Sequence, residues 1–545
     1  MERWLNRIGI VLLGGALVWS CFYVLQKETK IGDDRIRIRF AHWQLEGGLR
    51  EAFDAVAARY MEMHPHVKVE QMAVPGRVYP TWLRTAYAGG VMPDLIVIGG
   101  SSDEDLVLHY QPITSHVMEP NPYNVGTVHE GVPWRETFIN GLAGSSGLET
   151  LQDYYSVPVA ELSVRMYLNE RLWEQYFGDR PPPQSFAEFI EVCAQVDRKS
   201  KEAGTYLLPL AGSRFTANVL MIPLFQSQTQ KLWQAINPLD DLGNPSTSPS
   251  ALPFLPGLAN LEDPGVRKGF EIMRAVGMYL QEGFLQLDRD DAILMFARER
   301  ALMLPTGAWD YGSILEQSRF PITIFHLPYP RPGEGYFGEN VLGVQSEAGS
   351  GGATNFHLST RSAHPEIAID FLKFLTSYEG NSIFSSISKW PPSVAGIEME
   401  EETQAFAPIV EGYPGGFAMA PMMWGRGELY RLQSQAFHRL FDPEGGVEAF
   451  LEDIRPRFDA AIEEDVRRFL SERERSLKRS DIMLGAALLE QSGGRGVEAS
   501  QFDSRRISLL QQSQNFQELF RYRTEAHLEG RLLPKRTGKN TEAPR

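Results

Sequence analysis

The chain has 545 residues, of which 43% are hydrophobic and 22% are charged, which is the composition of a globular protein too long for a single compact core. Its formal net charge is −16, and this argues against nucleic acid as a partner, because phosphate binding requires a basic surface. The two cysteines, Cys21 and Cys193, stand in no zinc-ligand spacing, so no metal site is expected.

The N-terminus has the pattern of an export signal. Arg3 and Arg7 precede an uncharged apolar run at residues 8–25, and Lys27 follows it. The basic flank stays cytoplasmic, so we expect the body at the periplasmic or extracellular face of the cytoplasmic membrane, tethered by residues 8–25. Three forms of processing remain open: an uncleaved membrane anchor, a lipoprotein lipidated at Cys21, and a cleaved signal.

The segment that follows alternates strands with helices. Strands are predicted at 36–40, 67–72 and 95–98, and helices at 49–63 and 79–87. The first helix ends at His64-Pro65, since proline cannot continue it. Leu95–Ile98 is a continuous apolar strand of the kind that a parallel sheet buries. This order predicts an α/β lobe with a largely parallel sheet.

The rest of the chain is also mixed. Strands are predicted at 154–158, 164–167 and 301–304, and helices at 186–199, 264–281, 290–298, 363–375 and 447–469. Residues 236–265, rich in proline, glycine and serine, predict a long loop. Residues 471–545 differ from the body, since they carry 14 Lys/Arg against 10 Asp/Glu. They predict a helical or partly disordered extension.

Several segments carry a family resemblance through their order and spacing. They are Arg39 to Trp43, Met63 to Val69, Gly90 to Asp94, Tyr155 to Pro158 with Tyr167 to Asn169, Phe296 to Tyr311 with its Gly-Ala-Trp-Asp, and Ser362 to Ser377. Residues 36 to about 470 resemble family 1 extracellular solute-binding proteins of ABC transporters, the maltose- and oligosaccharide-binding type. Residues 216–262 and 399–424 depart from the pattern, so the ligand type does not carry over.

The resemblance implies an α/β, two-lobed periplasmic-binding-protein (type II) fold with a central cleft, to which this chain adds an N-terminal membrane segment and a helical C-terminal extension. The expected units are residues 1–32 as signal or anchor, 33–158 plus about 350–396 as lobe 1, 159–349 plus about 397–470 as lobe 2, and 471–545 as extension. The implied function is a receptor, not an enzyme, that needs no cofactor. It would capture a small ligand, expected to be a sugar, by lobe closure and deliver it to ABC permease subunits.

Sugars present apolar ring faces and polar edges, so aromatic, carboxylate and amide side chains after strand ends are the candidates for binding. The candidates are Trp309, Trp43, Asp103, Glu161, Tyr311, Trp390 and Trp424. Trp309 is favoured because family motif and position agree. Each tryptophan has a core alternative, Asp103 lies in an ordinary acidic loop, and Glu161 could form a structural ion pair.

Two alternatives remain open. The same fold could serve a membrane-anchored ligand sensor or an assembly partner, which the N-terminal segment and the basic extension suggest. A secreted carbohydrate-active enzyme could use an acid pair such as Glu161 with Asp310, but no catalytic motif accompanies it. His64 and His66 lie at a helix end, which favours a structural role over metal binding.

Overall fold

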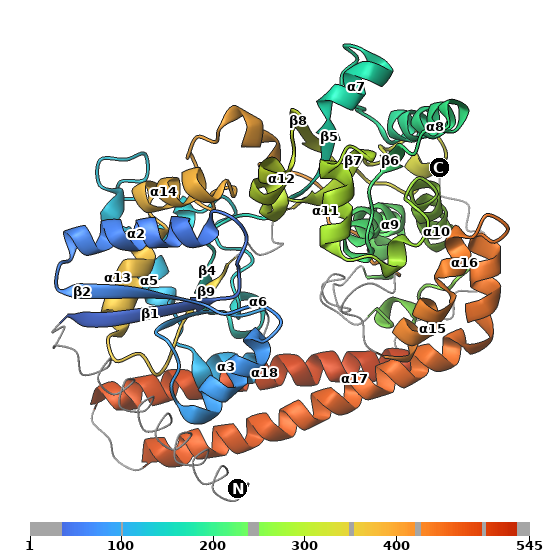
Figure 1. Cartoon of the computed structure of the whole chain (residues 1–545). Coiled ribbons are helices and arrows are strands. Elements are labelled where there is room, and N and C mark those ends of the chain that lie inside the picture. The colour runs from blue at the N-terminus through green and yellow to red at the C-terminus, as the bar shows by residue number, and fades with distance from the viewer. Residues whose placement is uncertain are drawn as a thin grey trace, which may run out of the picture.

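A computed structural model describes residues 35–99, 102–237, 250–347, 354–419, 427–492 and 497–530. Figure 1 shows two α/β lobes beside each other and two long C-terminal helices that run below both. The expected membrane segment at residues 8–25 lies outside these ranges. Within them, no helix combines the length and the apolar composition needed to cross a bilayer.

The first lobe is built on a five-stranded sheet with the order β2-β1-β3-β9-β4. Its strands are β1 (Ile36–His42), β2 (Val67–Ala73), β3 (Leu95–Val97), β4 (Ser156–Val157) and β9 (Phe356–Leu358). β1 is parallel to β2 and β3, whereas β9 is antiparallel to both β3 and β4. The sheet is therefore mixed, and its antiparallel strand, β9, comes from a much later part of the chain.

Helices cover this sheet on both faces (Figure 1). They are α2 (Leu49–Met63), α3 (Tyr79–Gly89), α4 (Asp103–His109), α5 (Thr114–Val117), α6 (Leu148–Leu151), α13 (Pro365–Leu375) and α14 (Tyr378–Ser388). α2 begins and ends where the sequence predicted. Asp94 caps the start of β3, since its carboxylate accepts hydrogen bonds from the Arg39 backbone N–H (2.8 Å) and the Ser362 hydroxyl (2.6 Å).

The second lobe contains a four-stranded sheet with the order β6-β7-β5-β8. Its strands are β5 (Val164–Asn169), β6 (Leu208–Leu210), β7 (Ala301–Gly307) and β8 (Ile322–His326). β5 is antiparallel to β7 and β8, and β6 is parallel to β7. The chain leaves the first lobe between β4 and β5, returns to it between β8 and β9, and leaves it again after α14.

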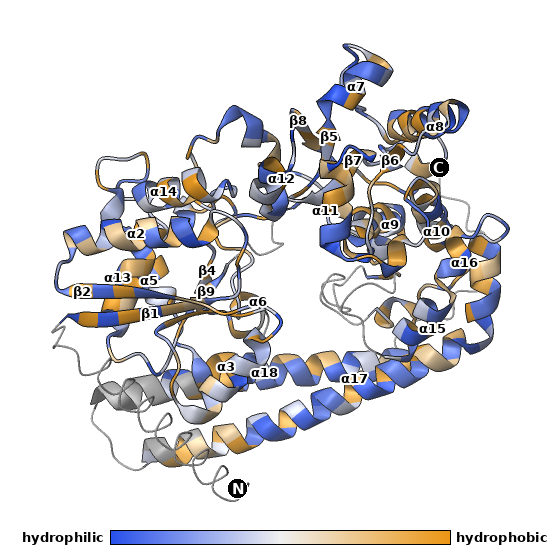
Figure 2. Ribbon diagram, viewed as in Figure 1, coloured by the Kyte–Doolittle hydropathy of each residue, from blue (hydrophilic) through white to orange (hydrophobic). Residues whose placement is uncertain are grey.

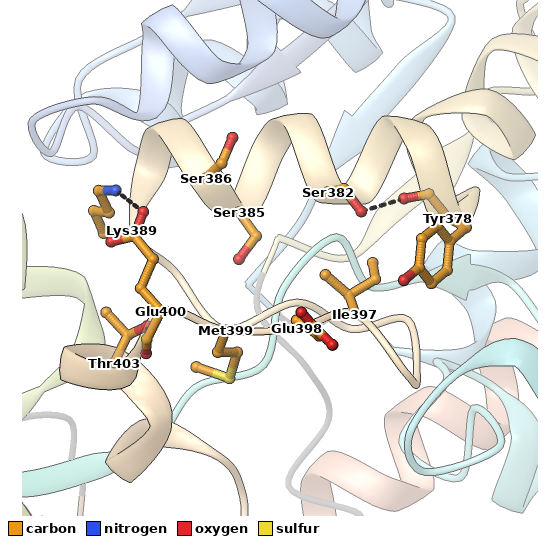
Figure 3. Close-up of a pocket in the computed structure, with 10 residues that line it drawn as sticks. All are labelled: Tyr378, Ser382, Ser385, Ser386, Lys389, Ile397, Glu398, Met399, Glu400 and Thr403. Carbon is orange, nitrogen blue, oxygen red and sulfur yellow. Dashed lines mark hydrogen bonds and ion pairs between the residues drawn. The ribbon is translucent and has the colours of Figure 1, made fainter.

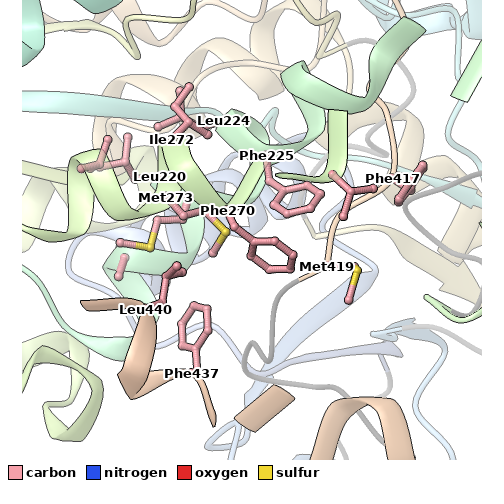
Figure 4. Close-up of a cluster of buried hydrophobic side chains, with 14 of the residues drawn as sticks. Leu220, Leu224, Phe225, Phe270, Ile272, Met273, Phe417, Met419, Phe437 and Leu440 are labelled. Atoms are coloured by element: carbon pink, nitrogen blue, oxygen red, sulfur yellow. The ribbon is translucent and has the colours of Figure 1, made fainter. Parts of the chain in front are cut away.

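Helices from two distant parts of the chain form the core of the second lobe. They are α7 (Glu170–Phe177), α8 (Phe186–Ala203), α9 (Arg214–Ile236), α10 (Pro264–Gly277), α11 (Arg289–Ala297), α12 (Tyr311–Gln317), α15 (Glu428–Ala436) and α16 (His438–Phe441). Figure 4 shows part of this core, where Phe225 and Phe270 of α9 and α10 meet Phe437 and Leu440 of the later helices. All four side chains are buried, so the lobe is incomplete without residues beyond 427.

Two long helices end the described chain and form what we call the C-terminal hairpin: α17 (Val447–Ser492) and α18 (Val497–Leu528). The predicted helix at 447–469 is thus only the first half of α17, which continues through the predicted extension. Figure 2 shows both helices as predominantly hydrophilic, with short apolar patches. The hairpin runs from the second lobe to the first (Figure 1).

Candidate functional site

The loop after β1 brings an aromatic ring and two polar side chains to the carboxyl edge of the first sheet. Trp43 is half-buried, and its ring contacts Tyr79 edge-on at 5.2 Å between centroids. Gly76 and Gly99, in the loops after β2 and β3, lie against the same indole, since a Cβ on either would be 3.7 Å from it. Trp43 therefore lies where three parallel strands end, the usual position of ligand sites in α/β folds.

Two residues of this loop carry buried oxygens that lack a hydrogen-bond partner among the described residues. They are the Oε1 atom of Gln44, whose side chain is 5% exposed, and the Oε2 atom of Glu46. Buried polar atoms are nearly always paired, because an unpaired one costs on the order of 1–3 kcal/mol. Unpaired oxygens in a surface loop therefore indicate a place where a ligand or water donates hydrogen bonds.

The second lobe contributes Trp309 from the turn after β7. Its ring packs against the hydrophobic core of the first lobe, and its indole Nε1 is buried without a partner among the described residues. The ring folds back on Gly307, where a Cβ would lie 2.2 Å from the indole atoms. The glycine of the Gly-Ala-Trp-Asp motif is thus required for the position of Trp309, which joins the two lobes.

A charged and aromatic group surrounds Trp309 on the second lobe. Phe215, near the start of α9, contacts its indole edge-on at 6.0 Å, and the Arg289 guanidinium lies over Phe215 at 5.7 Å. Arg289 also lies 3.6 Å from the carboxylate of Asp310, which accepts a hydrogen bond from Thr306 (2.6 Å). Burial raises the pKa of Asp310, while the Arg289 charge opposes that shift.

The charges of the two lobes influence each other across this contact. Glu46 of the first lobe adds to the rise in the pKa of Asp310 in the second. The backbone is close as well, since a Cβ on Gly312 of α12 would be 3.4 Å from the carbonyl oxygen of Gly47. The loop after β1 and the start of α12 therefore form one surface made from both lobes.

Glu161 lies in the segment that joins β4 to β5, between the lobes. Its side chain is 2% exposed, and its Oε1 atom has no partner among the described residues, so the ion pair considered from the sequence is not formed there. Burial, followed by repulsion from Glu347, raises the pKa of Glu161 to about 7. A carboxyl group with this pKa is partly protonated near neutral pH and can either donate or accept a hydrogen bond.

Two of the predicted site residues are located in hydrophobic cores. Trp390 is 4% exposed and belongs to the core of the first lobe. Tyr311 is 5% exposed and packs edge-on against Phe406 at 5.4 Å. Both side chains already have apolar surroundings on their ring faces, so the structure does not bring them to the surface that contains Trp43 and Trp309. Their role in binding stays a prediction.

Of the remaining two candidates, one lies away from the contact between the lobes and the other lies outside the described residues. Asp103 is the first residue of α4, and its carboxylate accepts a hydrogen bond from Ser513 of α18 at 3.0 Å. It therefore faces the C-terminal hairpin and not the contact between the lobes. Trp424 lies outside the described residues.

A separate pocket of about 240 Å³ lies beside the segment that leaves the first lobe after α14 (Figure 3). Its hydroxyl groups are already engaged with nearby carbonyls, as Ser382 and Ser385 show at 2.6 and 2.7 Å, and Lys389 is paired with Glu400. The pocket therefore offers a ligand few free polar groups, and we assign it to the packing of the interlobe connection.

The described residues contain no group of three or more His, Cys, Asp or Glu side chains placed to hold a metal ion. His64 instead contacts the Tyr123 hydroxyl at 2.8 Å, and the Asp370 carboxylate accepts a hydrogen bond from Tyr123 at 2.6 Å. His64, which follows the last residue of α2, thus has structural partners.

The candidate site also contains Gln44, Glu46, Phe215 and Arg289, which the sequence analysis did not select. The signal for the first two was available, since they follow Trp43 directly at the carboxyl end of a predicted strand. Phe215 and Arg289 gave no comparable signal, because their closeness to Trp309 depends on how α9 and α11 pack on the second sheet.

Comparison with known proteins agrees with this architecture. The sequence profile of the family described as bacterial extracellular solute-binding protein matches residues 55–407. The chain is 20% identical over 419 residues to the multiple sugar-binding protein of Streptococcus mutans serotype c, which covers 75% of this chain and 87% of that protein.

Solved structures share the fold. The apo form of RafE from Streptococcus pneumoniae superposes with a TM-score of 0.54 at 18% identity, over 79% of this chain and 100% of that one. A chitin oligosaccharide binding protein gives a TM-score of 0.51 at 16% identity, over 79% and 99%. The family profile covers well over half of the chain. The chain therefore belongs to the bacterial extracellular solute-binding proteins, which are binding proteins rather than enzymes.

Proposed function

We propose that this protein is an extracytoplasmic receptor that binds a carbohydrate between its two lobes and delivers it to an ABC importer. One observation carries the proposal. Buried polar atoms of Gln44, Glu46, Glu161 and Trp309 lack partners among the described residues, and they lie in the segments where the two lobes meet. The rings of Trp43 and Trp309 stand in the same segments.

This combination suits the chemistry of a sugar. An indole face covers the apolar face of a pyranose ring, while amide and carboxyl oxygens accept hydrogen bonds from its hydroxyls. Glu161, with a pKa of about 7, can adapt its protonation to a hydroxyl donor or acceptor. Proteins of the same fold are described with raffinose and with chitin oligosaccharide, which makes oligosaccharides the first class to test.

The proposal includes the organisation inferred from the sequence. Residues 33–158 with about 350–396 form lobe 1, and residues 159–349 with about 397–470 form lobe 2. The body would be held at the outer face of the cytoplasmic membrane by residues 8–25 or by a lipid on Cys21. The basic flank before the apolar run supports this orientation.

A thermal-shift screen of the full-length protein in detergent tests the receptor proposal, with raffinose, chitin oligosaccharides and maltotriose as the first ligands. A ligand held at 100 times its dissociation constant should stabilise the protein by about 2.7 kcal/mol. Calorimetric titration of each hit then gives its affinity, and chromatography after incubation shows whether the sugar remains intact.

Two variants localise the site. Trp309→Ala should weaken binding of the identified sugar by at least about tenfold, since a stacked aromatic contact and its buried area are lost. Tyr206→Ala is the control, because Tyr206 is on the same lobe and is 93% exposed. Equal affinities for the two variants would place the ligand elsewhere, and the absence of any sugar hit would contradict the proposed ligand class.

A ligand sensor with the same fold is the second candidate, and the C-terminal hairpin favours it. The hairpin contacts both lobes, whereas a transport receptor needs lobes that can move relative to each other. Deletion of the gene should abolish uptake of the radiolabelled sugar if the protein serves an importer. Unchanged uptake, together with binding by the purified protein, would favour the sensor.

A further inference from the structure

The C-terminal hairpin is rooted in the second lobe. Phe450, Ile454, Phe458 and Val466, on the first half of α17, are all less than about one-tenth exposed and belong to the large core of that lobe. Asp465 of the same helix accepts hydrogen bonds from backbone N–H groups at the start of α15, at 2.7 and 3.0 Å. This half of α17 cannot leave without opening the core.

The other half of the hairpin rests on the first lobe. Ile507, Leu509 and Leu510 of α18 are buried in a small cluster with side chains of β3, α3, α4 and α6. A helix of 46 residues is about 70 Å long at 1.5 Å per residue, and this length lets α17 reach from one lobe to the other, as Figure 1 shows. Further along, Phe520 of α18 packs on Phe469 of α17 at 5.7 Å, back at the second lobe.

Polar contacts hold the hairpin on the first lobe. Ser476 and Ser480 of α17 both donate hydrogen bonds to the carboxylate of Glu104, which is 2% exposed. Burial acts to raise the pKa of Glu104, but hydrogen bonds from Ser476, Ser102, a backbone N–H and Ser480 together lower it below its ordinary value. Arg505 of α18 binds both oxygens of the buried Asp153 carboxylate, at 2.6 and 2.7 Å. These contacts are specific to one position of the hairpin.

The lobes also meet on another side. The loop after β1 contacts the start of α12 near Gly47 and Gly312, and in Figure 1 α12 and α2, which follows this loop, lie above the first sheet, whereas the hairpin lies below it. A body joined at one side can rotate about that joint, but a second connection on the far side opposes the rotation. The distance between the lobes is therefore set at two places.

The geometry points to a strap: we propose that the C-terminal hairpin fixes the separation of the two lobes, and that its contact with the first lobe is the releasable end. This goes beyond the receptor function and does not depend on it. The two ends differ in kind, because the second-lobe end is part of a large apolar core. The first-lobe end is a small apolar cluster, together with hydrogen bonds and an ion pair that water can replace.

The strap predicts a fixed interlobe distance that changes when the first-lobe contact is broken. Spin labels on Val125→Cys and Tyr206→Cys, which are 70% and 93% exposed and on different lobes, report this distance by double electron–electron resonance. The full chain is used with Cys21→Ser, and Cys193 is fully buried and is not labelled. The parent should give one narrow distance distribution.

Two variants break the contact in different ways. Ser476→Ala with Ser480→Ala removes the donors to Glu104 without adding bulk or charge, and Leu510→Asp places a charge in the apolar cluster. Both should shift and broaden the distribution, and both should lose hydrogen-exchange protection in α4. Glu474→Gln is the control, since Glu474 is an exposed residue of the same helix, paired with Lys478, and it should leave the distribution unchanged.

A broad distribution in the parent would overturn the proposal, because the lobes would then move freely with the hairpin in place. Loss of protection in α4 without any change in distance would overturn it as well, since the hairpin would detach without consequence for the lobes. Circular dichroism of each variant checks that the helices remain formed. No sugar is present in this experiment, so its failure would leave the carbohydrate-receptor proposal standing.

Discussion

Replacement of Glu161 by glutamine tests whether this buried carboxyl group makes the stability of the protein depend on pH. The pKa of Glu161 rises from 4.5 to about 7 in the folded protein, chiefly through burial. The unfolded chain therefore loses the proton above pH 4.5, whereas the folded protein keeps it until about pH 7. The stability contribution of a neutral Glu161 is fully present below pH 4.5 and is lost as pH rises through the folded pKa, an expected loss of about 3 kcal/mol.

Denaturant unfolding of the parent and of Glu161→Gln between pH 4 and pH 8 measures this contribution. The difference between the two free energies of unfolding isolates Glu161 from the other titrating groups. We expect it to move by about 3 kcal/mol in favour of glutamine over that range, because glutamine stays neutral. Glu202→Gln, on the exposed surface of α8, is the control. A difference that does not change with pH would refute the assignment of a buried, unpaired carboxyl group.

Three other substitutions test further features. Gly307→Ala should destabilise the protein by about 1–3 kcal/mol and shift tryptophan fluorescence, because its Cβ would overlap the Trp309 ring; unchanged fluorescence would contradict this packing. Trp390→Ala should cost about 3–5 kcal/mol of unfolding free energy as a core truncation, whereas lost sugar affinity at full stability would return Trp390 to the binding site. Burial lowers the pKa of His357 to about 4, so the free energy of unfolding should fall by about 3 kcal/mol as pH drops from 6.5 to 4. His357→Gln should remove that dependence. The same pH dependence of unfolding in the parent and the variant would contradict this prediction.

Much of the first lobe was predictable from local pattern. β1, α2, β2 and α3 begin where the alternation of apolar residues and the Pro65 break predicted, because each element buries one face of a regular repeat. The mixed sheet was not predictable in this way. β9 has only three residues, Phe356 to Leu358, and its place between β3 and β4 follows from the three-dimensional arrangement of the lobes.

α9 is a helix that the spacing of apolar residues in the sequence does not predict. This helix, Arg214–Ile236, contains Pro223 and the polar run Gln226 to Gln230, which conceal its periodicity. The run is buried all the same, since Gln230 accepts a hydrogen bond from the Leu342 backbone N–H at 2.9 Å and Thr229 donates one to the Phe417 carbonyl at 2.6 Å. These hydrogen-bond partners come from distant loops, so they cannot be predicted from the sequence of the helix itself.

The candidate site was predictable only in part, for a similar reason. Trp43 and Trp309 were selected as candidates because each follows a strand, and strand ends mark the edge of the sheet where ligands bind. The same rule also selected Tyr311 and Asp103, which face a core and the hairpin instead. The direction of a side chain in the turn after a strand depends on the geometry of the turn. The sequence alone does not distinguish a tryptophan that other side chains cover from one that a ligand covers.

The position of β9 has a consequence for the order in which the protein can fold during synthesis. Among the described strands, β4 pairs in the first sheet only with β9, so that sheet remains unfinished until the chain has been made past residue 358. The second lobe waits longer still, because α17 supplies part of its core. A growing chain therefore carries an unfinished first lobe until residues beyond 358 have been made, and an unfinished second lobe with exposed apolar surface until its last fifth has been synthesised. Removal of α17 by C-terminal truncation would therefore damage the core of the second lobe and not only the end of the chain.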